Sequence, residues 1–238
     1  MSIADIKKRW DRVISEVQKK ALDIGRNPDD IKVVAVSKTH LAETMIDAIN
    51  AGVYCIGENY VQELIAKHPV VSSTVTNPVE WHFIGHLQSN KVKFITSFID
   101  MIHSCDSINL AREISKEAIK VNRTIEVLLQ VNTSGELSKS GCQPESVFKL
   151  YEESREIENI KVTGLMTIGS FTGIESIIRK EFTILRNLRE EINSKYSVNL
   201  KHLSMGMTGD YPVAIEEGST LLRIGTAIFG ERDYSLDD

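Results

Sequence analysis

The segment KVVAVSKTH, residues 32–40, places a run of β-branched and small apolar residues directly before a serine and a lysine. Such a run is typical of a strand that is buried on both faces. Side chains alternate between the two faces of a strand, so Val34, Val36 and Lys38 are expected to share one face. If the two valines point into a closed sheet, the Lys38 amine lies at its open end.

Seven further segments of the same kind follow, separated by stretches with helical spacing of apolar residues, the longest being residues 175–196. A further helix, residues 3–24, precedes the first strand. Regular alternation of strands and helices predicts a parallel sheet, and eight strands in about 200 residues favour a closed barrel over an open doubly wound sheet. The expected strands are residues 31–37, 53–57, 81–85, 101–105, 125–132, 162–166, 202–206 and 221–225.

The domain organisation follows from the same pattern. No linker rich in proline, glycine or serine interrupts the alternation. We therefore expect one α/β domain over residues 1–238, a single (β/α)8 TIM-type barrel with an extra N-terminal helix. Its parts are expected to be a helix and lead-in over residues 1–30, the barrel over 31–232 and a tail over 233–238.

Composition narrows the function classes. With 238 residues, 42% of them hydrophobic, the chain can bury a large core. A net charge of −5 gives no reason to expect nucleic acid or an anionic membrane as a partner. The start of the chain lacks the apolar region of a signal peptide, and three cysteines do not make a disulfide framework. These features predict a cytoplasmic protein.

Lys38 is the first candidate for chemistry, because barrels place their reactive groups at the carboxyl ends of the strands. A partly desolvated lysine favours its neutral form and is a nucleophile toward an aldehyde. Two carbonyl partners suit it, a sugar phosphate in an aldolase-like barrel or pyridoxal phosphate. Alternatively, the side chain simply extends to water.

Arg223 is the second candidate, because LLRIGTAIFG places it inside an otherwise apolar strand. A guanidinium there must find a partner or reach solvent, and a salt bridge inside the barrel is one alternative. The backbone amides of Gly225 and Thr226 can approach a phosphate, and Ser204 at the end of the seventh strand could add a hydroxyl donor. Lysine, arginine and phosphate donors together favour a phosphorylated aldehyde that carries a ring acceptor.

Other candidates are weaker. His82 and His86 are four residues apart, but at a strand end this spacing loses the helical geometry that binds zinc, so no metal site is predicted. Lys139 follows the fifth strand and could face the barrel mouth, although a mobile loop lysine is the favoured interpretation. Nothing beside Cys105 or Cys142 indicates a lowered thiol pKa.

Six longer motifs extend from the first strand to Arg232. They are VAVSKTH, IGENYVQE, WHFIGHLQSNKVKFI, VNTSGELSKSGC, GLMTIG and LSMGMTGDYPVAIEEGSTLLRIGTAIFGER. Together they resemble the pyridoxal phosphate homeostasis protein family, small single-domain relatives of the alanine racemase barrel. Two departures from the common wording, His86 in place of a frequent proline and Pro212 early in a helix, fall outside the expected ligand set.

The resemblance implies that the cofactor is pyridoxal phosphate. By this resemblance Lys38 would bind its aldehyde as a Schiff base, Arg223 would face the pyridine nitrogen, and Asn59 would lie near the cofactor. The phosphate would be held by Ser204, Gly225 and Thr226.

The resemblance also implies a carrier that holds pyridoxal phosphate and passes it to apo forms of enzymes that need it. An arginine at the ring nitrogen makes the ring a weaker electron sink than a carboxylate does. Racemisation needs a second acid or base. In the racemases this role resembles that of a tyrosine from a further carboxyl-terminal domain of the partner subunit, a domain that we expect to be absent because the sequence ends at Asp238. We therefore expect a non-catalytic protein, and a monomer, because the racemase-like dimer uses that domain. An amino acid racemase-like enzyme that uses pyridoxal phosphate is the alternative.

Overall fold

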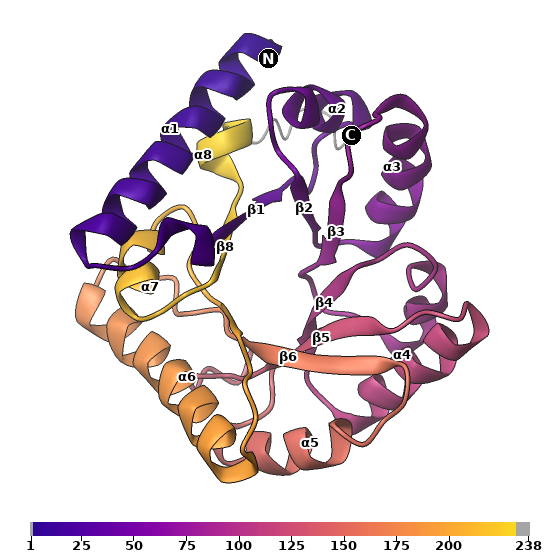
Figure 1. The fold of residues 1–238 in the computed structure, drawn as a ribbon, viewed down its shortest axis with the longest axis vertical. Coiled ribbons are helices and arrows are strands. Elements are labelled where there is room, and N and C mark those ends of the chain that lie inside the picture. The colour runs from indigo at the N-terminus through magenta and orange to yellow at the C-terminus, as the bar shows by residue number, and fades with distance from the viewer. Residues whose placement is uncertain (1, 232–238) are drawn as a thin grey trace.

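Eight parallel strands close into a barrel in the order in which they occur along the chain (Figure 1). The computed structural model describes residues 2–231, so the expected tail, residues 233–238, and the last residue of the expected barrel range lie outside the described residues. The barrel prediction is confirmed. The strands are β1 (Lys32–Val36), β2 (Cys55–Glu58), β3 (Glu80–Phe83), β4 (Met101–Cys105), β5 (Ile125–Gln130), β6 (Ile160–Met166), β7 (His202–Ser204) and β8 (Leu221–Ile224).

Helices surround the barrel, as Figure 1 shows. The extra N-terminal helix is α1 (Ile3–Asp23), whose first turn is closed by a capping box between Ser2 and Asp5. This helix contacts α2, α7 and α8. The other helices are α2 (Ala42–Asn50), α3 (Val61–Thr74), α4 (Ile108–Lys120), α5 (Val147–Ser154), α6 (Glu175–Tyr196), α7 (Tyr211–Glu216) and α8 (Thr226–Phe229).

One connection between strands lacks an α-helix, and two of the helices contain a proline. Between β3 and β4 the chain forms a 3₁₀ helix, η2 (Ser89–Phe94), in place of an α-helix. Helix α3 continues through Pro69, which has no N–H to donate within the helix. Pro212 is tolerated because it falls in the first turn of α7.

The interior of the barrel is filled by side chains. One apolar cluster lies inside it and consists of Val34, Cys55, Met101, Leu128, Met166 and Leu221, with Ile168 packed against it. A larger cluster lies between the strands and the surrounding helices. This packing leaves the carboxyl ends of the strands as the place where side chains can face a ligand. None of the described helices is both long enough and apolar enough to cross a membrane.

Candidate functional site

A cavity of about 550 Å³ lies over the carboxyl ends of six strands, and its lining comes from the segments that follow β1, β2, β3, β6, β7 and β8. Val36 and Lys38 both line it, while Val34 lies in the barrel interior, so the predicted alternation along the first strand is confirmed. Five of the six expected cofactor-binding residues meet here, namely Lys38, Asn59, Arg223, Gly225 and Thr226.

Ser204, the sixth expected residue, has a different position. It is fully buried and is not part of the cavity lining. Its Oγ accepts a hydrogen bond of 2.6 Å from Nη1 of Arg223. Ser204 therefore contacts Arg223. The expectation that it holds a phosphate is not supported, because Ser204 is not among the residues that line the cavity.

The turn that carries Lys38 is held in an unusual backbone conformation. Thr39, the next residue, has φ of 68°, a left-handed conformation that β-branched residues rarely adopt. The backbone N–H of Thr39 donates to Oε2 of Glu63 over 2.8 Å, and its hydroxyl donates to the carbonyl oxygen of Lys38 over 2.6 Å. These two bonds fix the direction in which the chain leaves Lys38.

A buried ionic cluster of Lys67, Glu58 and Glu63 packs against the turn that carries Lys38. Lys67 donates to Oε1 of Glu58 over 2.8 Å and to the carbonyl oxygen of Ser37 over 3.1 Å. The same ammonium pairs with Glu63 over 2.5 Å. Glu58 is fully buried, and burial raises the pKa of its carboxyl group although Lys67 opposes this shift. The cluster ties β2 and α3 to the residue that precedes Lys38.

Asn59 lines the cavity, but the oxygen of its side-chain amide is buried. Its Oδ1 is buried and has no hydrogen-bond partner among residues 2–231. The backbone of Asn59 lies very close to that of Gly85, which follows β3. A Cβ atom at Gly85 would lie 2.1 Å from the Asn59 carbonyl oxygen. Only glycine fits at that position.

Arg223 lies at the floor of the cavity and is 4% exposed. Besides the bond to Ser204, its Nη2 donates to the carbonyl oxygen of Thr167 over 2.8 Å. Burial lowers its pKa to about 10, while the charge of Asp210 acts in the opposite direction, so the group stays cationic at neutral pH. No carboxylate of residues 2–231 pairs with it, so the salt-bridge alternative is not supported.

The connection after β7 supplies lining that the sequence reasoning missed, namely Met207, Thr208 and Gly209. Its start requires glycine, because Gly206 has φ of 95° and a Cβ atom there would lie 2.5 Å from Cβ of Ala214. Asp210 closes the turn by accepting from the Met207 N–H over 2.5 Å. The glycines of SMGMTGD were the signal that the chain bends tightly at this point.

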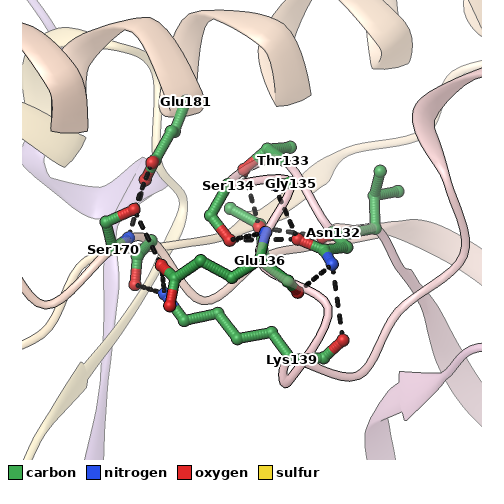
Figure 2. Close-up of polar contacts among 11 residues, drawn as sticks. Asn132, Thr133, Ser134, Gly135, Glu136, Lys139, Ser170 and Glu181 are labelled. Carbon is green, nitrogen blue, oxygen red and sulfur yellow. Dashed lines mark hydrogen bonds and ion pairs between the residues drawn. The ribbon is translucent and has the colours of Figure 1, made fainter.

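Lys139 is held in place, so its interpretation as a mobile loop lysine was wrong. Its side chain is 12% exposed and pairs with Glu136 over 2.6 Å. Its ammonium also donates to the carbonyl oxygen of Gly169 over 2.9 Å. Figure 2 shows these contacts together with Ser170, whose backbone N–H donates to Glu181 over 2.7 Å. The loop after β5 is thus bonded to the loop after β6.

This bonding positions part of the cavity lining. Phe171 and Thr172, in the loop after β6, line the cavity, and Lys139 lies 5.2 Å from the centroid of the Phe171 ring. Phe171 is nonetheless 83% exposed. Lys139 itself is not part of the lining, but it contacts the loop that supplies Phe171 and Thr172.

The two histidines considered for metal binding lie in different environments. His82 is buried inside the barrel, whereas the side chain of His86 is 60% exposed and faces Asp106 at 4.0 Å. Ligand atoms of Cys55, Glu80 and His82 do lie within 4.8 Å of one another. The Glu80 carboxylate is, however, already paired with Lys32, which competes with a cation for the same oxygen.

The cysteine thiols have raised pKa values, in keeping with the absence of any sequence signal for a lowered thiol pKa at Cys105 or Cys142. Burial raises the pKa of both Cys105 and Cys142 to about 12. Burial also raises the pKa of Cys55. All three thiols are therefore protonated at neutral pH and are poor nucleophiles.

The closed eight-stranded parallel barrel with its surrounding helices defines the class, a barrel of the alanine racemase type. The family model described as "Alanine racemase, N-terminal domain" matches residues 17–233. Within this class, the chain belongs to the pyridoxal phosphate homeostasis protein family.

Curated relatives support this assignment over most of the chain. A pyridoxal phosphate homeostasis protein of Aquifex aeolicus is 44% identical over 226 residues, which cover 95% of this chain and 98% of that protein. The protein of the same name from Homo sapiens is 39% identical, covering 89% of this chain and 82% of its own.

Solved structures agree with the fold. An unknown protein from Bifidobacterium adolescentis has a TM-score of 0.89 at 37% identity and covers 95% of each chain. PipY of Synechococcus elongatus, solved with PLP bound, has a TM-score of 0.81 at 30% identity, covering 94% of this chain and all of its own. A histidine racemase from Leuconostoc mesenteroides, at 13% identity and a TM-score of 0.71, shares the fold, and this chain covers 59% of it.

Proposed function

We propose that this protein binds pyridoxal phosphate as a reversible Schiff base on Lys38 and acts as a store and donor of the cofactor. The observation that carries the proposal is that Lys38, the buried Arg223 and the start of α8 open into one cavity of about 550 Å³. That volume lies within the range of small-molecule sites. The PLP-bound PipY structure and the names of the curated relatives support the choice of ligand.

The chemistry of the lining fits the three functional ends of this ligand. Lys38 supplies a primary amine, the group that condenses with an aldehyde. A guanidinium that donates but never accepts is available for a ring nitrogen at Arg223. Gly225 is the N-cap of α8 and Thr226 is its first residue. The first backbone N–H groups of a helix have no acceptor within it, and such groups bind phosphate oxygens.

Each residue has a separate task in this proposal. Lys38 would supply the amine, which in its unprotonated form would attack the aldehyde carbon. As the C=N bond forms, the aldehyde oxygen would leave as water with the two protons of the amine. Arg223 donates a hydrogen bond to the ring nitrogen and keeps its own proton. When bound, pyridoxal phosphate supplies a reactive aldehyde and a ring that withdraws electrons, and the arginine weakens this withdrawal by disfavouring protonation of the ring.

A non-catalytic role has two supports. The curated relatives are named as homeostasis proteins. In addition, a racemase needs a second acid or base across from its lysine, and Asp210 is the only carboxyl group on the described lining. One oxygen of Asp210 already accepts from the Met207 N–H.

The first experiment adds pyridoxal phosphate to the purified protein. We expect a visible absorption band, and borohydride reduction followed by peptide mass spectrometry should place the label on Lys38. Lys38→Ala should remove both signals, while the control Lys116→Ala, at an exposed lysine outside the lining, should keep them. A colourless parent protein, or a label that persists in Lys38→Ala, would contradict the proposal.

A second experiment separates a carrier from an enzyme. The loaded protein is incubated with amino acids and, in parallel, with an apoenzyme that requires pyridoxal phosphate. We expect activation of the apoenzyme and no turnover of amino acids. Racemisation or decarboxylation that Lys38→Ala abolishes would favour the enzyme alternative.

A further inference from the structure

A line of polar side chains crosses the inside of the barrel below the cavity. It starts at Arg223, whose Nη1 bonds to Ser204. Ser204 Oγ lies 2.8 Å from Nδ1 of His103, and Nε2 of His103 lies 2.9 Å from Nδ1 of His82. The other ring nitrogen of His82 faces Glu80 at 3.5 Å, near the amino end of the barrel. The line joins strands β8, β7, β4 and β3.

Both histidines of this line are neutral at physiological pH. Each is at most 1% exposed. Burial lowers the pKa of His82, and it lowers the pKa of His103 well below the ordinary value, where His82 and Arg223 act in the same direction. Each ring therefore carries one N–H and one bare nitrogen.

The two ends of the line fix where those protons lie. A guanidinium can only donate, so the Ser204 oxygen accepts from Arg223. The Ser204 hydroxyl then donates its own proton to Nδ1 of His103. At the other end, the Glu80 carboxylate can only accept, because its pKa is lowered to about 2 by the His82 contact and by Lys32.

If both histidines were Nδ1–H tautomers, every hydrogen bond between Ser204 and His82 would run in the opposite direction, and two contacts would be lost. The bare nitrogen of His82 would face the Glu80 carboxylate. The Ser204 hydroxyl would lose its acceptor, since within residues 2–231 it hydrogen-bonds only to Arg223 and His103. An unsatisfied buried donor is costly. Both ends thus select the same arrangement, in which His82 and His103 are Nε2–H tautomers.

We propose that His82 and His103 are positioning residues whose Nε2–H tautomers give this line of hydrogen bonds one direction, holding Ser204 as the acceptor that orients the Arg223 guanidinium toward the cavity. The Thr167 carbonyl oxygen holds the second nitrogen of the same guanidinium. The remaining donors of Arg223 are then left for a ligand in the cavity. The expected effect on pyridoxal phosphate binding rests on the proposed function, whereas the expected tautomers of the two histidines do not.

The tautomers are measured on the protein without any ligand. In ¹⁵N-labelled protein, long-range ¹H–¹⁵N spectra distinguish the two tautomers and the imidazolium, and single substitutions assign the signals of the six histidines. We expect His82 and His103 as neutral Nε2–H tautomers at about pH 8. An Nδ1–H tautomer or an imidazolium at either residue at this pH would overturn the inference.

Two substitutions at His103 test its effect on Arg223. His103→Asn retains an acceptor near the Nδ1 position for Ser204, whereas His103→Phe removes it and keeps the ring volume. We expect His103→Phe to weaken pyridoxal phosphate binding about tenfold, as the loss of one buried hydrogen bond near 1.4 kcal/mol implies. We also expect a shifted absorption band of the bound cofactor, and His103→Asn should stay within about threefold of the parent.

Equal losses in the two variants, or no loss in His103→Phe, would refute the positioning role. If His103→Phe does not fold, the tautomers and the His103→Asn affinity decide the question. A parent protein that fails to bind pyridoxal phosphate would refute the proposed function instead, and the inference would then stand or fall on the tautomers.

Discussion

Replacing Lys67 by methionine should destabilise the protein strongly and in a pH-dependent way. The substitution keeps a long side chain but removes the ammonium that bonds to Glu58, Glu63 and the carbonyl oxygen of Ser37. Glu58 is fully buried and one of its oxygens already lacks a partner, so the variant would leave a buried carboxylate bonded to Ser37 alone. Removing one partner of a buried ion pair costs about 3 kcal/mol or more.

The sign of the pH dependence follows from the pKa of Glu58, which burial raises in the folded parent protein. Without Lys67 this pKa rises further, so between the unfolded and folded pKa values the native state binds more protons than the unfolded state. Stability of the variant therefore falls as pH rises through that interval. We expect the cost at about pH 8 to exceed the cost at about pH 5 by about 1 kcal/mol or more.

The assay is urea unfolding of parent and variants at both pH values. Lys67→Met combined with Glu58→Gln should recover most of the loss, because a neutral amide replaces the unpaired carboxylate. Lys116→Met, at a lysine whose ion pair is exposed, is the control and should unfold at the midpoint of the parent. A loss below about 1 kcal/mol at about pH 8, or a larger loss at about pH 5, would refute the reasoning.

Three further predictions concern other parts of the barrel. Gly85→Ala should destabilise the fold by roughly 2 kcal/mol in thermal unfolding and weaken ligand binding, because the new Cβ would lie 2.1 Å from the Asn59 carbonyl oxygen; an unchanged protein would contradict this contact. The pKa of Glu80 is lowered to about 2 by His82 and Lys32, so its carboxylate should stabilise the fold above its unfolded pKa, and this contribution should be lost as the pH falls through the folded pKa. The free energy of unfolding of Glu80→Gln should therefore fall less steeply with acidification than that of the parent. Equal slopes in the two proteins would exclude this role of Glu80. Cys105, with a pKa raised to about 12, should react with iodoacetamide only after denaturation, and rapid labelling of native protein would show that the thiol is accessible.

Much of the fold could be predicted because its signals are local. Alternation along a strand fixed which face Val34, Val36 and Lys38 share, and apolar spacing predicted α6 with the observed limits, Glu175–Tyr196. Arg223 stood out as a cation inside an apolar strand. These properties depend on the backbone period of two or 3.6 residues, which neighbouring residues in the chain already define.

The contacts across the barrel could not be predicted in this way. Ser204 and His103 are 101 residues apart in sequence yet 2.8 Å apart in the structure, and Lys139 bonds to a carbonyl oxygen of the next loop.

The sequence by itself determined the eight strands, the buried faces and the presence of an amine and a guanidinium at the carboxyl ends. Only the tertiary structure decided that Ser204 serves the arginine, that Lys139 is fixed, and that two histidines join one end of the barrel to the other. The physical reason is that barrel closure and strand stagger set which interior side chains meet, and those distances depend on all eight strands at once.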